Sequence, residues 1–148
     1  MRAGSLTSTS QATPEQFLEA FDEVLAGGKD ILYIAFSSGL SGTYNSSLIA
    51  RDTLLEKYPE RKIIVVDSLA ASMGQGLFVY FAACLKEEGN TIEEVAEWCE
   101  KNKLKISLFT LLLLFVLIII FVYNIIFKIE GNEEIVFLEK EDNEILKE

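Results

Sequence analysis

The stretch that decides the fold is Ile31-Leu32-Tyr33-Ile34-Ala35-Phe36, followed directly by Ser37-Ser38-Gly39-Leu40-Ser41-Gly42-Thr43-Tyr44. The first run is short, apolar and bounded by turn residues, which is typical of a buried strand. The second is rich in hydroxyl groups and contains two glycines, which allow a tight turn. Large apolar residues then recur at helical spacing over residues 43–58. The order is therefore strand, turn and helix.

A second apolar run, Ile63-Ile64-Val65-Val66, follows that helix and ends in Asp67-Ser68. A strand, a helix and a second strand of this kind predict a βαβ unit with a parallel sheet buried on both faces. We therefore expect an α/β fold built on a partial parallel sheet. Both strands carry polar residues at their carboxyl ends, where ligands of open α/β sheets bind.

The turn after the first strand has the composition of an anion site. The hydroxyl groups of Ser37, Ser38, Ser41 and Thr43 crowd the start of the predicted helix, where free amide donors and the helix dipole favour negative charge. A carboxylate or a phosphate is the expected ligand. A well-capped connection that binds nothing is the alternative, since Ser and Thr are common N-caps.

Composition restricts the classes of function. The 148 residues are 50% hydrophobic, which suits one folded domain, and the net charge of −10 argues against binding to a nucleic-acid backbone. The sequence contains no histidine. A zinc site and histidine-activated nucleophiles are therefore not expected, and Cys84 and Cys99 are predicted to be buried reduced thiols.

Capping signals place the remaining helices of the first hundred residues. Thr13-Pro14-Glu15-Gln16 forms a capping box that starts a helix ended by Gly27-Gly28. Ser72-Met73-Gly74-Gln75-Gly76 opens another, whose apolar run 77–85 is predicted to be a buried core helix. A second capping box at residues 91–94 starts a further helix.

The character of the chain changes after residue 105. Residues 106–127 are almost entirely apolar, and a helix of that length is about 33 Å long, enough to cross a bilayer. Lysines precede it at positions 101, 103 and 105, so the positive-inside rule predicts a cytoplasmic α/β part tethered to the membrane by one span. Residues 128–148 are predicted to be a solvated acidic tail with at most one marginal element.

Residues 7 to about 105 resemble the DegV family, bacterial proteins that bind a fatty acid and, in some cases, present it to a fatty acid kinase. The matching motifs are Thr9-Ser10-Gln11 with Thr13-Pro14-Glu15-Gln16-Phe17, Ile34 to Tyr44, Val66-Asp67-Ser68, and Ser72 to Gly76. The predicted organisation is a partial DegV-like α/β domain at 1–105, a transmembrane helix at 106–127 and the tail at 128–148.

The resemblance implies where the ligand would lie. The carboxylate would be held by Thr9 and by Ser41 with the adjacent Gly42, and the turn from Ser72 to Gly76 would form part of the pocket wall. The acyl chain would run between two α/β domains. The candidate ligand-binding residues are Thr9, Ser10, Ser38, Ser41, Gly42, Ser72, Met73 and Gly74. No catalytic residue, metal ligand or cofactor is expected, and the bound fatty acid is the ligand.

The sequence also departs from the family pattern. Family members begin with a further strand carrying an Asp-Ser-type motif and continue into a second domain, whose histidine completes the headgroup site. The sequence therefore predicts an interior fragment joined to an unrelated hydrophobic segment, as a truncated or frameshifted reading frame would produce. Acyl binding is expected to be weak.

Two other functions remain open. The chain could be a single-pass membrane protein whose α/β part is a degenerate remnant that binds no ligand. It could instead be an enzyme acting on phosphorylated substrates with the serine turn as a phosphate cradle. The turn lacks the Gly-x-x-x-x-Gly-Lys spacing of a nucleotide-binding loop, and no motif places a base.

Overall fold

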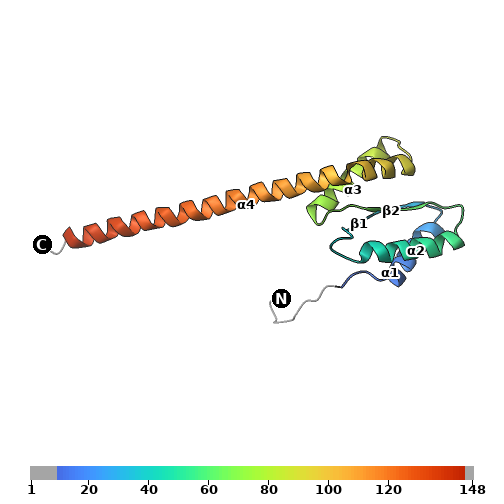
Figure 1. Cartoon of the computed structure of the whole chain (residues 1–148), viewed down its shortest axis with the longest axis horizontal. Coiled ribbons are helices and arrows are strands. Elements are labelled where there is room, and N and C mark those ends of the chain that lie inside the picture. The colour runs from blue at the N-terminus through green and yellow to red at the C-terminus, as the bar shows by residue number, and fades with distance from the viewer. Residues whose placement is uncertain (1–9, 146–148) are drawn as a thin grey trace. The chain divides into compact units, whose positions relative to one another are not determined.

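The structure is a computed structural model that describes residues 10–145, with side chains as far as residue 128. It divides into two compact units, Met1–Leu108 and Phe109–Glu148. The described residues form α1 (Pro14–Ala26), β1 (Ile31–Ala35), α2 (Thr43–Lys57), β2 (Ile63–Asp67), α3 (Met73–Glu87) and α4 (Ile92–Ile145) (Figure 1).

The two strands confirm the predicted βαβ unit. β1 and β2 pair in parallel, in a register that sets Ile31 beside Ile63 and Ala35 beside Asp67. The carboxyl ends of both strands therefore lie at the same edge of the sheet, and the loops that follow them start side by side.

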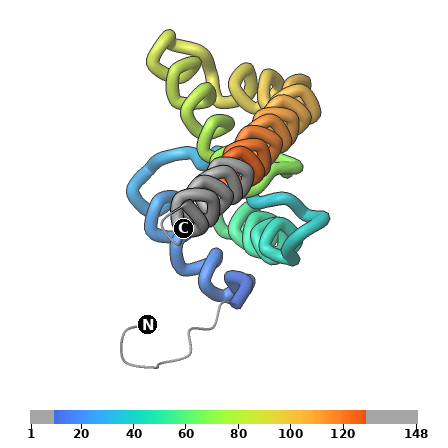
Figure 2. Tube along the Cα trace, turned by 90° about the vertical axis from the view of Figure 1, so that its left-hand side faces the viewer, coloured from blue at the N-terminus to red at the C-terminus, as the bar shows by residue number. Residues whose placement is uncertain are grey.

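Helices cover both faces of this sheet, with α1 and α2 on one face and α3 with the first part of α4 on the other (Figure 2). The alternation of side chains along a strand explains the two layers. In β1, Ile31 and Tyr33 pack with α1 and α2, whereas Leu32 and Ile34 pack with α3 and α4. The apolar strands are thus buried on both sides, as their sequence predicts.

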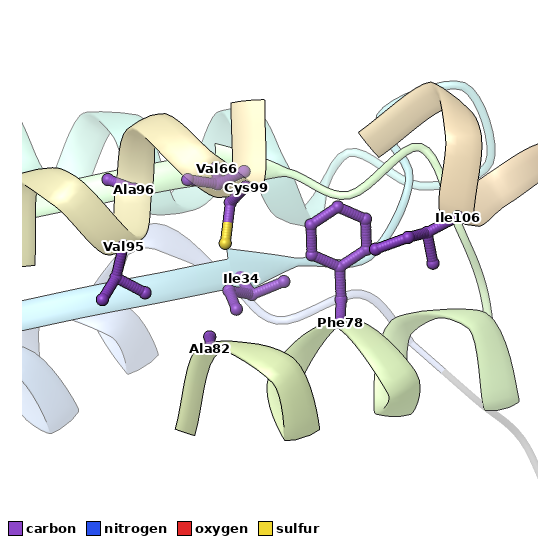
Figure 3. Packing of buried hydrophobic residues seen from close by; sticks show 8 residues of the cluster. All are labelled: Ile34, Val66, Phe78, Ala82, Val95, Ala96, Cys99 and Ile106. Atoms are coloured by element: carbon purple, nitrogen blue, oxygen red, sulfur yellow. The ribbon is translucent and has the colours of Figure 1, made fainter. Parts of the chain in front are cut away.

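Phe78 lies at the centre of the second layer. Its side chain is fully buried, and its ring meets that of Trp98 edge to face with 6.3 Å between centroids. Around it lie side chains from β1, β2, α3 and α4 (Figure 3). The buried members of this cluster are Ile34, Val66, Phe78, Ala82, Val95, Ala96, Cys99 and Ile106.

Both predicted capping boxes are present. The Thr13 hydroxyl accepts a hydrogen bond from the Gln16 amide, and the Gln16 side chain accepts one from the Thr13 amide at 2.9 Å. Thr91 and Glu94 make the same reciprocal pair, with the Thr91 amide 2.8 Å from the Glu94 carboxylate. These bonds satisfy amides that the first helical turn leaves without partners, which is why α1 and α4 begin where they do.

The prediction that the apolar run 77–85, which lies in α3, is a buried core helix is wrong. Phe78 and Ala82 are buried, but Val79, Tyr80 and Phe81 are 49%, 62% and 37% exposed. A helix in the outer layer of an α/β unit buries only the stripe that faces the sheet. A continuous apolar run cannot reveal which stripe that is.

α4 is one uninterrupted helix, so the expected boundaries at residues 105 and 127 fall inside a single element. Its first part packs in the Met1–Leu108 unit, where the Ser107 hydroxyl donates to the Leu69 carbonyl at 2.8 Å. Beyond it the large apolar side chains of residues 108–127 are 43–66% exposed. By length and composition this is the one described helix that could cross a membrane.

The tail differs from the expectation of a solvated segment with at most one marginal element. The backbone remains helical to Ile145. Residues 128–145 contain no proline and several Glu and Lys, which are good helix formers, so nothing in the sequence forces α4 to stop. The acidic composition of the tail does not indicate where the helix ends.

Burial has a chemical consequence for Cys99. Its side chain is fully buried, and desolvation raises the pKa of the thiol from 9.0 to about 11. Since the thiolate is the reactive form, Cys99 is expected to resist iodoacetamide at pH 8.5 in the folded chain. The partly exposed Cys84 should react first. Peptide mapping by mass spectrometry checks the order, and alkylation of Cys99 at the rate of Cys84 would contradict the burial.

Candidate functional site

The candidate site is formed by the two loops that follow β1 and β2. The loops are joined by backbone hydrogen bonds, from the Ser37 amide to the Ala70 carbonyl at 3.0 Å and from the Ser68 amide to the Ala35 carbonyl at 3.2 Å. These bonds continue the pairing of the strands beyond their ends. The two hydroxyl-rich loops are consequently held as one surface.

Asp67, the last residue of β2, ties the loops together through its side chain. One carboxylate oxygen accepts hydrogen bonds from the amides of Ser38 and Leu69, both at 3.1 Å. The other accepts the Ser38 hydroxyl at 2.5 Å. Asp67 as a residue is 9% exposed, so these three donors, more than water, compensate the charge of its carboxylate.

The Asp67 bond determines what Ser38 can do. A hydroxyl has one hydrogen, and that of Ser38 points to Asp67. Ser38 therefore presents acceptor lone pairs to its surroundings and has no hydrogen left for a ligand carboxylate. It acts in the structure as a link between the loops.

Ser41 and Thr43 provide the donor that Ser38 does not. The Ser41 oxygen accepts the Thr43 amide at 3.2 Å and lies 2.8 Å from the Thr43 hydroxyl oxygen, where either group can donate. The pair holds two hydroxyl hydrogens and uses one between them. The other has no acceptor among the described residues. The first turn of α2 carries no acidic side chain, so its positive dipole end is not neutralised there.

Gly42 precedes α2 and lies beneath the side chain of Gln11. A Cβ atom added to Gly42 would come within 2.5 Å of the Gln11 Oε1 and 2.8 Å of its Nε2. The same amide group donates to the Ser46 hydroxyl, one turn further along α2, at 3.3 Å. Gln11 therefore lies across the start of α2, and it comes directly after Thr9 and Ser10.

The loop after β2 ends in an unusual backbone conformation at Ser72, with φ +50° and ψ −121°. A residue with a side chain rarely adopts this conformation, which costs on the order of 1–3 kcal/mol. Ser72 and Met73 are exposed, Met73 to 80%, whereas Gly74 is buried and its amide donates to Ala71 at 3.0 Å. Gln75 fixes this loop to the sheet by donating to the Ile34 carbonyl at 3.0 Å.

The structure brings most of the predicted site residues to one edge of the sheet. Ser38, Ser41 and Gly42 lie in the loop after β1, and Ser72, Met73 and Gly74 lie in the loop after β2 and at the start of α3. Ser10 is exposed just before α1, and Thr9 lies outside the described residues.

Two residues with clear roles here were not among the candidates. Asp67 had a usable signal, because its position at the end of a buried strand already placed it at the ligand edge. Gln11 had no such signal. A glutamine in an irregular segment gives no indication of the residues that its side chain contacts in the fold. Among the described side chains there is no cluster of three metal-ligating groups.

Comparison with known proteins gives a consistent result. A family model described as "Uncharacterised protein, DegV family" matches residues 1–113. DegV domain-containing protein CPE0026 of Clostridium perfringens is 56% identical over 106 residues, 72% of this chain and 36% of its own length. The chain thus spans about a third of the length of this curated relative.

Solved structures share the fold. A DegV lipid binding protein from Thermotoga maritima superposes with a TM-score of 0.61 at 33% identity, over 70% of this chain and 36% of its own. The Fatty Acid Kinase (Fak) B3 protein of Streptococcus pneumoniae, loaded with linoleic acid, superposes with a TM-score of 0.57 at 33% identity. The match covers 64% of this chain and 32% of that protein.

Proposed function

The chain belongs to the DegV family, and we propose that it binds the carboxylate of a long-chain fatty acid at the loops after β1 and β2. The role is that of a carrier for a partner of the fatty acid kinase type, without a catalytic step of its own. Two observations support this proposal. The similar Streptococcus pneumoniae protein is loaded with linoleic acid, and hydrogen-bond donors lie at the start of α2.

The observation that carries the proposal is the arrangement of Ser41, Gly42 and Thr43. The Gly42 amide has no acceptor among the described residues, and the Ser41–Thr43 pair has one uncommitted hydroxyl hydrogen. Both lie at the positive end of α2, where an anion is stabilised. We assign Thr9 and Ser10 to the same headgroup, since they precede Gln11, which crosses this turn.

The loop after β2 is assigned to the wall of the site. Ser72, Met73 and Gly74 follow Asp67, whose carboxylate holds the two loops together. The 80% exposed Met73 offers a flexible apolar side chain for an acyl chain to contact. We expect this chain by itself to bind weakly, because it matches only 36% of the length of the Clostridium perfringens relative and so offers an acyl chain only part of the surface of such a protein.

The assignment of Ser41 to the headgroup predicts that removing its hydroxyl weakens fatty acid binding. Changing Ser41→Ala removes a hydroxyl and the acceptor of the Thr43 amide. A bond to a charged group contributes about 1.5–3 kcal/mol, so fatty acid affinity should fall roughly tenfold or more. Native mass spectrometry of the detergent-extracted chain with added oleate measures the occupancy. Ser47→Ala is the matched control, since Ser47 is buried and bonds its own helix at 2.7 Å. A wild-type chain that takes up no oleate would refute the proposed function.

A second function is favoured by the exposed apolar side chains of α4. Leu108 to Phe127 would be stable in a hydrocarbon environment, and we propose that this segment crosses the membrane with Lys101, Lys103 and Lys105 on the cytoplasmic side. If the chain were only such a membrane protein, its α/β part would bind no ligand. Extraction of membranes at alkaline pH tests the span, because a chain released into the soluble fraction would exclude it.

A further inference from the structure

We propose that the carboxyl edge of the sheet, formed by residues 36–42 and 68–73, lies against the headgroup layer of a lipid bilayer. The inference rests on the proposed membrane span of α4 and does not require that the chain binds a fatty acid. If both proposed functions hold, the carboxylate site opens at the depth of the lipid headgroups. The path of α4, the distribution of charge and two exposed apolar side chains support this contact.

α4 runs from the amino edge of the sheet to its carboxyl edge within the unit that ends at Leu108. Near the start of the helix, Glu93 forms an ion pair with Lys62, the residue directly before β2. Near the end of the unit, the Ser107 hydroxyl donates to the Leu69 carbonyl at 2.8 Å, in the loop after β2. The exposed apolar part of α4 therefore begins at the carboxyl edge.

A span that begins at Leu108 sets the depth of this edge in the membrane. The polar headgroup layer is about 5–7 Å thick on each side of the hydrocarbon. Since Ser107 bonds Leu69 directly, the loop after β2 begins within this layer. β2 has five residues, so the opposite edge of the sheet lies roughly 15 Å away along the strands. The exit of α4 thus holds the carboxyl edge at the bilayer surface.

The two edges of the sheet differ in charge. The carboxyl edge contains no lysine, arginine, aspartate or glutamate in residues 36–42 and 68–73, although the whole chain has a net charge of −10. The loops at the amino edge carry Lys29, Asp30, Glu60, Arg61 and Lys62. Asp67 at the carboxyl edge is buried and hydrogen-bonded. Because moving charges out of water is costly, the carboxyl edge is the one suited to a lipid interface.

Side chains at this edge fit both the apolar and the polar layers of a lipid surface. Leu40 is 69% exposed and Met73 is 80% exposed, the two highest values among the described large hydrophobic side chains. One lies on each loop. Lys105, next to the exit of α4, is exposed and forms no ion pair with the described side chains, whereas the two lysines before it pair with glutamates of α4. It is therefore available to a lipid phosphate.

Fluorescence quenching in vesicles tests the contact. Leu40→Cys, Met73→Cys and the control Glu60→Cys are made as full chains in a Cys84→Ser background, which leaves the buried Cys99 as the other thiol. Each is labelled with the dye NBD and reconstituted into vesicles of phosphatidylcholine and phosphatidylglycerol. Glu60 is the matched control, because its side chain is 62% exposed in the loop before β2. A lipid with a nitroxide on its headgroup should quench the dyes at positions 40 and 73 strongly and leave the dye at position 60 unchanged.

Several results would overturn the inference, and alkaline extraction of the same vesicles separates them. If the chain stays in the vesicles but the dyes at positions 40 and 73 are quenched no more than the dye at position 60, the contact is refuted and the span stands. A blue-shifted dye without quenching would mean that protein covers this edge, which also refutes the contact. Release of the chain at alkaline pH would refute the span and the contact together. A chain that binds no oleate but shows the expected quenching would lose the proposed ligand and keep the contact.

Discussion

Changing Phe78→Ala is expected to unfold most of the Met1–Leu108 unit. The side chain is fully buried among the residues of β1, β2, α3 and α4. Removing a buried phenylalanine ring costs about 3–5 kcal/mol, comparable to the whole stability of a domain at the low end of the usual 5–15 kcal/mol. The cavity would lie where the helices meet the sheet, so the site loops would lose their support.

The fluorescence of Trp98 can be used to measure the stability lost in Phe78→Ala. Trp98 is the only tryptophan in the sequence, and its ring lies 6.3 Å from that of Phe78, so its fluorescence reports the state of this core during urea unfolding. Phe81→Ala is the matched control. It removes the same ring from the same helix, also beside Trp98 at 5.7 Å, but at a position 37% exposed. Phe81→Ala should cost much less, and equal losses for the two variants would contradict the described packing.

The contrast between these phenylalanines also shows where sequence reasoning about the fold ends. The βαβ unit followed from the sequence because turn residues bound two apolar runs that are too short for helices. The starts of α1 and α4 followed from capping boxes, which are local. The buried stripe of α3 did not follow, because residues 77–85 are apolar on every face and only the tertiary position of the helix selects Phe78 over Phe81.

The site was predictable to a similar degree. The sequence predicted that the hydroxyl groups lie at the carboxyl edge of the sheet, where the structure has them, because parallel strands bring their carboxyl ends together. It could not decide which hydroxyl donates to a ligand. That choice depends on hydrogen bonds between loops that are 29 residues apart, where Ser38 gives its hydrogen to Asp67. Composition therefore made Ser38 a reasonable ligand candidate, whereas in the structure its hydroxyl links the two loops through Asp67.

A buried carboxylate lies beside the proposed anion site. Asp67 is negative, and a fatty acid headgroup is negative too. Its two oxygens accept three hydrogen bonds, all directed from the loops that form the site, so the charge is largely compensated where it lies. The ligand side of the site is left with the donors of Ser41, Gly42 and Thr43. Asp67 thus holds the two loops in place, and a weak repulsion remains between its carboxylate and that of the ligand.

Two substitutions of Asp67 distinguish its role in holding the two loops together from the repulsion between its charge and the ligand carboxylate. Asp67→Ala is expected to lose affinity for oleate, whereas Asp67→Asn is expected to keep or gain it. Asp67→Ala removes the acceptor for the Ser38 and Leu69 amides, and a hydrogen bond to a charged group contributes about 1.5–3 kcal/mol. Leu69 has a φ of +51°, a strained conformation that this bond helps to hold. We expect a total destabilisation of about 3–5 kcal/mol, together with loss of oleate binding as the loops separate.

Asp67→Asn keeps one oxygen for both amides and replaces the other with an NH₂ group. That group donates to the Ser38 oxygen, so the Ser38 hydroxyl hydrogen becomes free for the ligand while the negative charge disappears. The variant should be less stable than wild type by about 1–2 kcal/mol yet bind oleate at least as tightly. Ser38→Ala is the control, because it loses the same hydroxyl bond without gaining a donor. Urea unfolding followed by Trp98 fluorescence gives stability, and native mass spectrometry gives occupancy. If Asp67→Asn and Asp67→Ala lost binding equally, the carboxylate charge itself would be required, and the role of Asp67 as a link between the loops would be refuted.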